Sequence, residues 1–168
     1  MRAVIVYESI FGSTKKVAEA IAAGLTDCAD VSVVPVTSAD AHILDGRDLV
    51  VVGGPTHTHG MSRPSTRKMA GKLAKPGSEV ELVLGAISGP GVREWLGSLG
   101  RLQVAAAAFD TRLQGLPAFT GRASRSIRRH LAHQGARIAA PPESFLVEGF
   151  TGALVEGELD RARAGESA

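Results

Sequence analysis

The 168-residue sequence has a single cysteine, Cys28, and no apolar run that approaches the roughly 20 residues of a membrane span. One cysteine excludes an internal disulfide and is typical of a reducing compartment, so we expect a cytoplasmic protein. The amino terminus enters a strand pattern directly, without the features of a signal peptide. The sequence therefore predicts neither a membrane span nor secretion.

The chain also lacks a strong charge of either sign. Its 19 Lys and Arg residues against 17 Asp and Glu residues give a net charge of +2 at pH 7. Nucleic-acid binding requires a clustered basic footprint, so we expect no nucleic-acid partner. A cluster of arginines, Arg122, Arg125, Arg128 and Arg129, lies on or next to a predicted helix over 124–133. It is either a solvated face or a docking surface for an acidic partner.

The apolar residues predict alternating strands and helices. Unbroken β-branched runs at 3–7, 31–36 and 49–52 are typical of strands buried on both faces of a parallel sheet. Pro35 cannot donate to a ladder, which favours a sheet edge for the second strand. Gln103–Phe109 is predicted as a fourth strand, and Pro141–Pro142 divides the last one. Helices are expected near 17–25, 65–73, 92–99, 124–133 and 156–163.

These elements indicate one α/β domain over residues 1–164, with a frayed tail at 165–168. The segment 76–91 is either a long loop or contains a short strand around Val80–Leu84. Helical spacing predicts that Met69 and Leu73 face the core. Trp95 is an apolar anchor rather than a platform for a planar ligand.

A hydroxyl-rich turn joins the first strand to the first helix. Helix amino termini carry unpaired N–H groups and partial positive charge, so they bind anions. Ser9, Ser13 and Thr14 surround Gly12 there, without a lysine or arginine inside the turn. The pattern favours a phosphate monoester held by neutral donors; the alternative is that Ser13 or Thr14 only caps the helix.

A second polar segment, Gly53–Met61, follows the third strand at the edge where open α/β sheets bind ligands. His57 and His59 have the spacing of metal ligands, but no third nearby ligand completes a zinc site. They are either solvent-exposed imidazoles or contacts to a flat ligand. A third such segment, Asp110–Leu113, follows the fourth strand.

The motif Tyr7-Glu8-Ser9-Ile10-Phe11-Gly12-Ser13-Thr14 resembles the FMN-phosphate loop of the flavodoxin family, and Gly53-Gly54-Pro55-Thr56 resembles its second loop. The resemblance implies a flavodoxin-like three-layer sandwich with a five-stranded parallel sheet of order 2-1-3-4-5. It also implies FMN as the cofactor, with Asp110 accepting from the ring N3–H and Thr111 as a second polar contact. Arg112 is either a charge beside the ring or a plain surface charge. The implied FMN-binding residues are Ser9, Ile10, Phe11, Gly12, Ser13, Thr14, Pro55, Thr56, His57, Thr58, His59, Gly60, Phe109, Asp110, Thr111 and Arg112.

The same resemblance implies electron transfer through FMN, with a redox partner protein or a small-molecule electron acceptor. Two alternatives remain open. One is an FMN-dependent NAD(P)H:quinone-type reductase. The other is a flavodoxin-fold binding or regulatory module that has lost FMN. No metal-dependent or hydrolase site is expected.

Overall fold

Five parallel strands form the centre of the protein. The computed structural model describes residues 1–73, 83, 85–115, 120–149 and 152–165. Within it the strand order is β2-β1-β3-β5-β7, and every neighbouring pair along this path is parallel. This confirms the predicted order 2-1-3-4-5, with the proline-containing strand at the edge. The strands are β1 (Arg2–Tyr7), β2 (Asp30–Pro35), β3 (Leu49–His57), β5 (Ala105–Leu113) and β7 (Glu143–Glu148).

Three two-residue strands extend this sheet: two are additions to the prediction, and the third is the first piece of the last strand, predicted at 137–139 ahead of a second piece at 144–147. β4 (Gly60–Met61) folds back antiparallel on β3, and β8 (Ala153–Leu154) folds back antiparallel on β7. β6 (Arg137–Ile138) pairs with the start of β5, whereas β7 pairs with its end. Pro141–Pro142 lie between β6 and β7, as expected for residues that interrupt a ladder.

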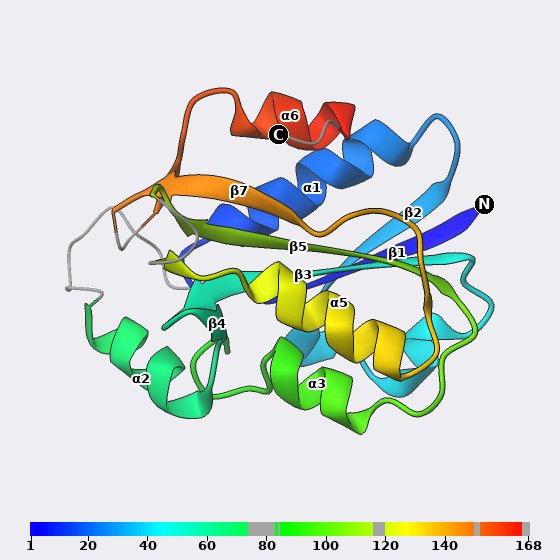
Figure 1. Cartoon of the computed structure of the whole chain (residues 1–168), viewed down its shortest axis with the longest axis horizontal. Helices are drawn as coiled ribbons and strands as arrows, with labels where there is room; N and C mark the ends of the chain where they lie inside the picture. The colour runs from blue at the N-terminus through cyan, green and yellow to red at the C-terminus, as the bar shows by residue number, and fades with distance from the viewer. Residues whose placement is uncertain (74–82, 84, 116–119, 150–151, 166–168) are drawn as a thin grey trace.

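Helices cover both faces of the sheet, as predicted (Figure 1). α1 (Ser13–Leu25) and α6 (Glu158–Ala164) lie together on one face, and α3 (Val92–Ser98) and α5 (Ala123–His133) pack on the other. α2 (Pro64–Leu73) and two 3-10 turns, η1 (Val36–Ser38) and η2 (Ala41–Leu44), complete the described elements. In the described part of the chain, no helix combines the length and apolar character needed to cross a membrane. The possible strand at Val80–Leu84 lies almost wholly outside the described residues.

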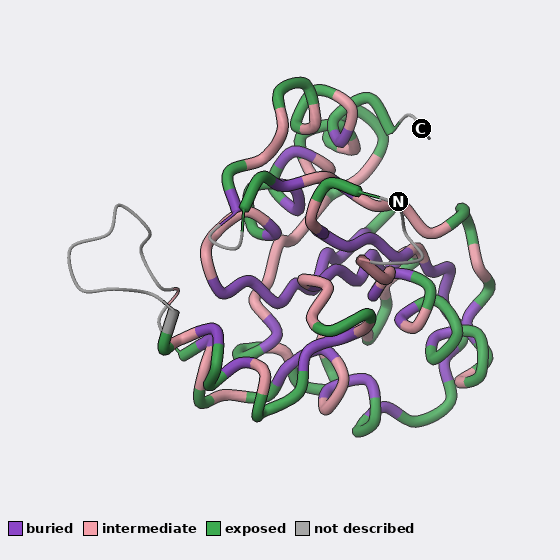
Figure 2. The backbone as a smooth tube through the Cα atoms, turned by 60° about the vertical axis from the view of Figure 1, so that its left-hand side comes forward, coloured by how far each residue is buried: buried purple, intermediate pink, exposed green. Residues whose placement is uncertain are grey.

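Alternation along the buried strands supplies two apolar layers. Val4 and Val6 of β1 pack with α3 and α5, whereas Ile5 and Tyr7 face α1 and α6. Figure 2 shows these buried strands inside a more exposed outer shell. Trp95 is 4% exposed in the α3 layer, which confirms it as a core anchor. Met69 is 58% exposed, so its predicted inward placement is wrong; the side chain of Leu73 lies outside the described residues.

Two adjacent glycines in β3 provide a test of this packing. A Cβ on Gly53 would lie 2.0 Å from Cζ of the buried Phe109 ring, whereas a Cβ on Gly54 would meet nothing closer than 3.7 Å. Core overpacking costs about 1–3 kcal/mol, and Gly→Ala at a compatible position gains about 0.4–1 kcal/mol. We expect Gly53→Ala to lower the free energy of unfolding in urea by about 1–3 kcal/mol. Gly54→Ala is the matched control, and equal effects of the two variants would contradict the packing described.

Candidate functional site at the carboxyl ends of the strands

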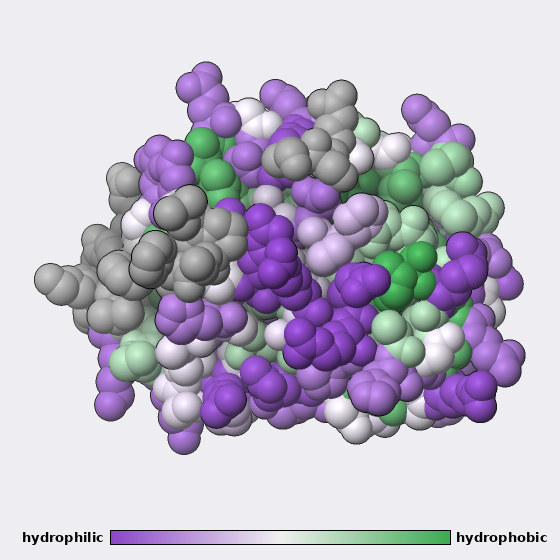
Figure 3. Space-filling model, in the orientation of Figure 1, coloured by the Kyte–Doolittle hydropathy of each residue, from purple (hydrophilic) through white to green (hydrophobic). Residues whose placement is uncertain are grey.

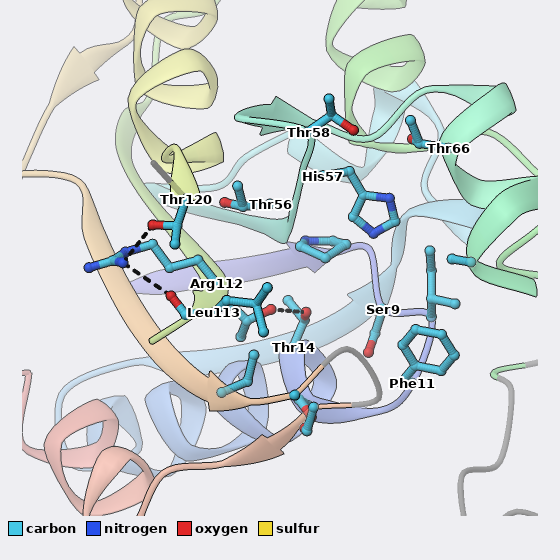
Figure 4. A pocket seen from close by; sticks show the side chains of 18 of the residues that line it. Ser9, Phe11, Thr14, Thr56, His57, Thr58, Thr66, Arg112, Leu113 and Thr120 are labelled. Carbon is cyan, nitrogen blue, oxygen red and sulfur yellow. Dashed lines mark hydrogen bonds between the residues drawn. The ribbon is translucent and has the colours of Figure 1, made fainter. Parts of the chain in front are cut away.

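A cavity of about 340 Å³ opens where β1, β3 and β5 end. Its volume lies in the range of small-molecule pockets. Figure 4 shows its walls, which come from the turn before α1, the β3–β4 hairpin and the end of β5. The structure thus brings the three predicted polar segments together. The predicted residues that line the cavity are Ser9, Ile10, Phe11, Ser13, Thr14, Pro55, Thr56, His57, Thr58, His59, Thr111 and Arg112.

Four predicted site residues do not line the cavity. Phe109 is 2% exposed and packs edge-on against Phe145 in the core, with 6.1 Å between ring centroids. Gly12 is the residue before α1, where its φ of 92° requires a residue that tolerates the left-handed region. Gly60 pairs with His57 across the hairpin. Asp110 is fully buried beneath the cavity wall.

The start of α1 has no side-chain cap. The alternative that Ser13 or Thr14 merely caps this helix is therefore wrong. Ser9 Oγ accepts the Gly12 N–H at 3.1 Å, which curls the turn but leaves the Ser9 hydroxyl proton available. The first turn of α1, whose Ser13 and Thr14 line the cavity, consequently has N–H groups without a side-chain acceptor, as an anion site requires.

The remaining hydroxyls of this turn are not equivalent. Ser13 Oγ donates to the Gly152 carbonyl, so its single proton is already used. Thr14 and Thr111 share one hydrogen bond of 2.8 Å between their Oγ1 atoms, shown in Figure 4. Two hydroxyls joined by one bond retain one free proton. An anion at this end can therefore accept hydrogen bonds from the Ser9 hydroxyl and from the Thr14–Thr111 pair. The Ser13 hydroxyl could donate to it only after breaking its bond to the Gly152 carbonyl.

Asp110 has a different role from the one predicted. Its Oδ2 accepts the Ser124 N–H of α5 at 2.8 Å and the Thr56 hydroxyl at 3.2 Å. Thr56 Oγ1 in turn accepts the Ala123 N–H at 2.9 Å. Burial raises the pKa of Asp110, and the Ser124 N–H partly opposes that shift. The carboxyl group holds the amino terminus of α5 and is turned away from any ligand in the cavity.

Arg112 is 8% exposed, so the alternative of a plain surface charge is wrong. Its Nη1 donates to the carbonyls of Leu113 and Gly115 at 3.2 and 2.8 Å and to Thr120 Oγ1 at 3.0 Å. Burial lowers the pKa of its guanidinium, and Asp110 opposes that shift. Arg112 is the only Lys, Arg, Asp or Glu among the described lining residues. The described lining therefore includes one cationic residue and no carboxylate, and Asp110 and Glu158 interact with that cation from outside the lining.

The second predicted loop is a tight hairpin. β3 runs through His57 and pairs with β4, so Thr58 and His59 form the turn, with φ values of 46° and 72°. Positive φ is rare for residues with a side chain, above all β-branched ones. Gly121 packs against the turn, and a Cβ there would lie 2.1 Å from the His59 Cα. The surrounding structure thus holds a strained turn at the cavity wall.

His57 and His59 both line the cavity, with His57 directed inward in Figure 4. Burial, and secondarily the nearby Arg67, lowers the pKa of His57, so its ring is neutral at pH 7. A neutral imidazole offers one donor and one acceptor to a ligand. Among the residues that the structure describes, no group of three or more His, Cys, Asp and Glu residues is arranged to hold a metal ion.

A buried network of charged and polar side chains includes Glu8, the residue directly before the turn that carries Ser9. Glu8, 3% exposed, accepts from the Ser62 hydroxyl and from the Val92 N–H at 2.9 Å. Arg67, 2% exposed, donates to Ser62 Oγ at 3.0 Å and pairs with Glu94 at 3.0 Å. Burial is the main cause of the raised pKa of Glu8, and the hydrogen bond from Ser62 is the largest opposing cause. This network joins the residue before Ser9 to α2 and α3.

Sequence reasoning missed part of the cavity wall. Helical periodicity marks Met69 and Ala70 as apolar, but it does not distinguish a position facing the core from one facing a pocket. The turn between β7 and β8 carries no ligand motif and reaches the cavity only through the fold. The missed lining residues are Thr66, Met69, Ala70, Leu113, Thr120, Val147, Gly149 and Gly152.

Comparisons with known proteins agree with this fold. A family model described as a flavodoxin domain matches residues 4–82. A flavodoxin from the domain Archaea is similar in structure, with a TM-score of 0.64 and 21% identity over 97% of this chain and 92% of its own. Flavodoxin 1 from Bacillus cereus has a TM-score of 0.66 and 16% identity over 97% and 92% of the two chains.

A flavodiiron core, Flv1 from Synechocystis sp. PCC6803, has a TM-score of 0.61 and 14% identity; the match covers 98% of this chain and 34% of that one. No curated protein matches the sequence. The structural likenesses define a flavodoxin fold. The family-model match over residues 4–82 agrees with this fold.

The strained turn predicts a stabilising substitution. Thr58→Gly removes the cost of a positive φ, about 1–3 kcal/mol, and restores about 0.4–1 kcal/mol of unfolded-chain entropy. We expect the free energy of unfolding to rise by about 1 kcal/mol, measured by urea denaturation. Thr58→Ala keeps a Cβ at positive φ and is the matched control. A glycine variant no more stable than the alanine variant would show that the turn is unstrained.

The raised pKa of Glu8 predicts a pH dependence of stability. The folded state binds this proton more tightly than the unfolded state, whose pKa is near the ordinary 4.5. Stabilisation from Glu8 is thus complete below that pH and is lost as the pH rises through the folded-state value. We expect Glu8→Gln, which keeps an acceptor for Val92, to lose less stability than wild type between acidic and neutral pH. Parallel stability curves in urea titrations across this range would refute the assignment.

Proposed function

We propose that the cavity binds FMN and that the protein acts in electron transfer. FMN carries a phosphate monoester at one end and a flat isoalloxazine ring at the other. The observation that supports the proposal most strongly is the uncapped amino terminus of α1 with the free hydroxyl protons of Ser9 and the Thr14–Thr111 pair. Such donors match a phosphate group and have no other role in the described structure.

The rest of the cavity fits the ring. The β3–β4 segment contributes Pro55, His57 and His59 to the cavity wall, and the end of β5 contributes Arg112 and Leu113. These residues would orient the ring and exclude water from it. No described lining residue is Tyr or Trp, so ring contacts would come from Phe11, from imidazole rings and from apolar side chains.

When bound, FMN supplies one- and two-electron redox chemistry, and the protein supplies binding and electrostatics. Reduced FMN carries negative charge. The buried Arg112, with no lining carboxylate among the described residues to oppose it, would stabilise that charge and raise the reduction potential. Neutral His57 would add hydrogen-bonding capacity without negative charge.

Flavin titration tests this proposal. We expect the protein to bind FMN, and Ser9→Ala combined with Thr14→Val to weaken FMN binding by about a hundredfold or more, because two hydrogen bonds to a charged group, each about 1.5–3 kcal/mol, are lost. Riboflavin lacks the phosphate, so its affinity should change little. The readout is quenching of flavin fluorescence. Thr26→Val, at the exposed far end of α1, is the control variant.

Equal losses for FMN and riboflavin would place the phosphate elsewhere, and failure of wild type to bind either flavin would refute the function. The same preparation also separates a carrier from a reductase. Steady-state oxidation of NAD(P)H with a quinone acceptor would favour the reductase, and its absence would favour the carrier.

A further inference from the structure

The exposed face of α5 carries an arginine cluster without an internal partner. Arg125, Arg128 and Arg129 are exposed, and the structure gives their side chains no ion pair or hydrogen bond to any described residue. Residues three and four apart share one helix face, so Arg125 lies beside both of the others. Figure 3 shows strongly hydrophilic side chains gathered over α5 near the centre of this view. We call these three residues the arginine face.

The arginine face is unfavourable for the helix that carries it. Like charges three and four residues apart destabilise a helix by about 0.2–0.5 kcal/mol per pair. Cations are favoured at the carboxyl end of a helix, yet Arg125 lies in the first turn and Arg128 and Arg129 follow directly. α5 contains no Asp or Glu that would offset them. A helix face whose only role is contact with water normally carries both positive and negative side chains.

The position of the arginine face connects it to the cavity. The amino terminus of α5 is anchored by Thr56, which lines the cavity, and by Asp110 beneath it. At 1.5 Å per residue, the helix from Ala123 to Arg129 covers only about 9 Å. A protein bound to the arginine face would therefore lie beside the cavity mouth.

We propose that the arginine face docks an acidic redox protein. This proposal rests on the proposed function, because it names the partner of the same site. Positive charge beside the mouth would steer an acidic surface into encounter and orient it there. An electron would then pass from the reduced partner to bound FMN, so the partner is oxidised and the cofactor is reduced. Three cations on one short helix are too few for the phosphate contacts of a nucleic-acid site.

Matched charge reversal tests the proposal. Arg125→Glu with Arg129→Glu changes the net charge by as much as Arg101→Glu with Arg137→Glu. Arg101 and Arg137 are both exposed. Arg101 precedes β5 and Arg137 begins β6, so both lie at the amino ends of the strands, opposite the ends that form the cavity. The probe is a reduced acidic [2Fe–2S] carrier protein, mixed with FMN-loaded protein in a stopped-flow instrument at about 20 mM and 200 mM salt.

We expect the first pair to lower the second-order rate constant at low salt by about tenfold or more and to abolish its decrease with salt. The second pair should change both much less. Calorimetric titration of each variant with the same carrier, with and without FMN, gives a second readout that does not need the cofactor.

Equal effects of the two variants in rate and in binding would overturn the docking proposal while leaving FMN binding intact. Wild type that binds the acidic carrier through the arginine face but takes up no FMN would support the docking and refute the proposed function. Wild type that binds a DNA or RNA duplex through this face more tightly than the acidic carrier would overturn the proposal in favour of a nucleic-acid partner.

Discussion

The parallel register of three strands is the constraint on which the site depends. Tyr7 of β1, Gly53 of β3 and Phe109 of β5 stand side by side in the sheet. The residues immediately after them therefore emerge at one edge. That alignment lets Thr14 reach Thr111 and lets Thr56 reach Asp110. A shift of one residue would turn every side chain in a strand to the opposite face and separate these pairs. Gly53 has no side chain, which leaves space for the Phe109 ring in this row.

The sequence was sufficient for the sheet order and the helices, because buried strands and amphipathic helices have distinct periods. It was insufficient for the ends of the strands. β3 and β5 both continue through segments predicted as loops, since pairing with β4 and β7 overrides the local polar composition. In a strand, neighbouring side chains point to opposite faces. Thr111 consequently meets Thr14 of α1, whereas Asp110 meets the start of α5.

Contacts between distant segments explain the other differences. Ser13 and Gly152 are 139 residues apart, and Glu8 and Val92 are 84 residues apart. No spacing rule connects such pairs, so the sequence could name Ser13 as a hydroxyl donor but could not show that its proton is committed. The structural role of Glu8 could not be predicted for the same reason. A carboxylate directly before the turn has no periodic signature, and its role becomes visible only when Ser62 and α3 pack against it.

Three acidic residues near the cavity, Asp110, Glu8 and Glu94, are directed toward other parts of the protein. Asp110 accepts from the first turn of α5, Glu8 from the first turn of α3, and Glu94 from Gly91 while pairing with Arg67. Each carboxylate thereby stabilises backbone N–H groups or a buried cation and contributes little negative field at the cavity. Arg112 in the wall interacts electrostatically with the buried Asp110 and with Glu158, whereas the side chains of the arginine face have no ion pair among the described residues. The resulting positive field would favour an anionic phosphate, a reduced flavin and an acidic partner surface for the same electrostatic reason, although the chain as a whole is nearly neutral.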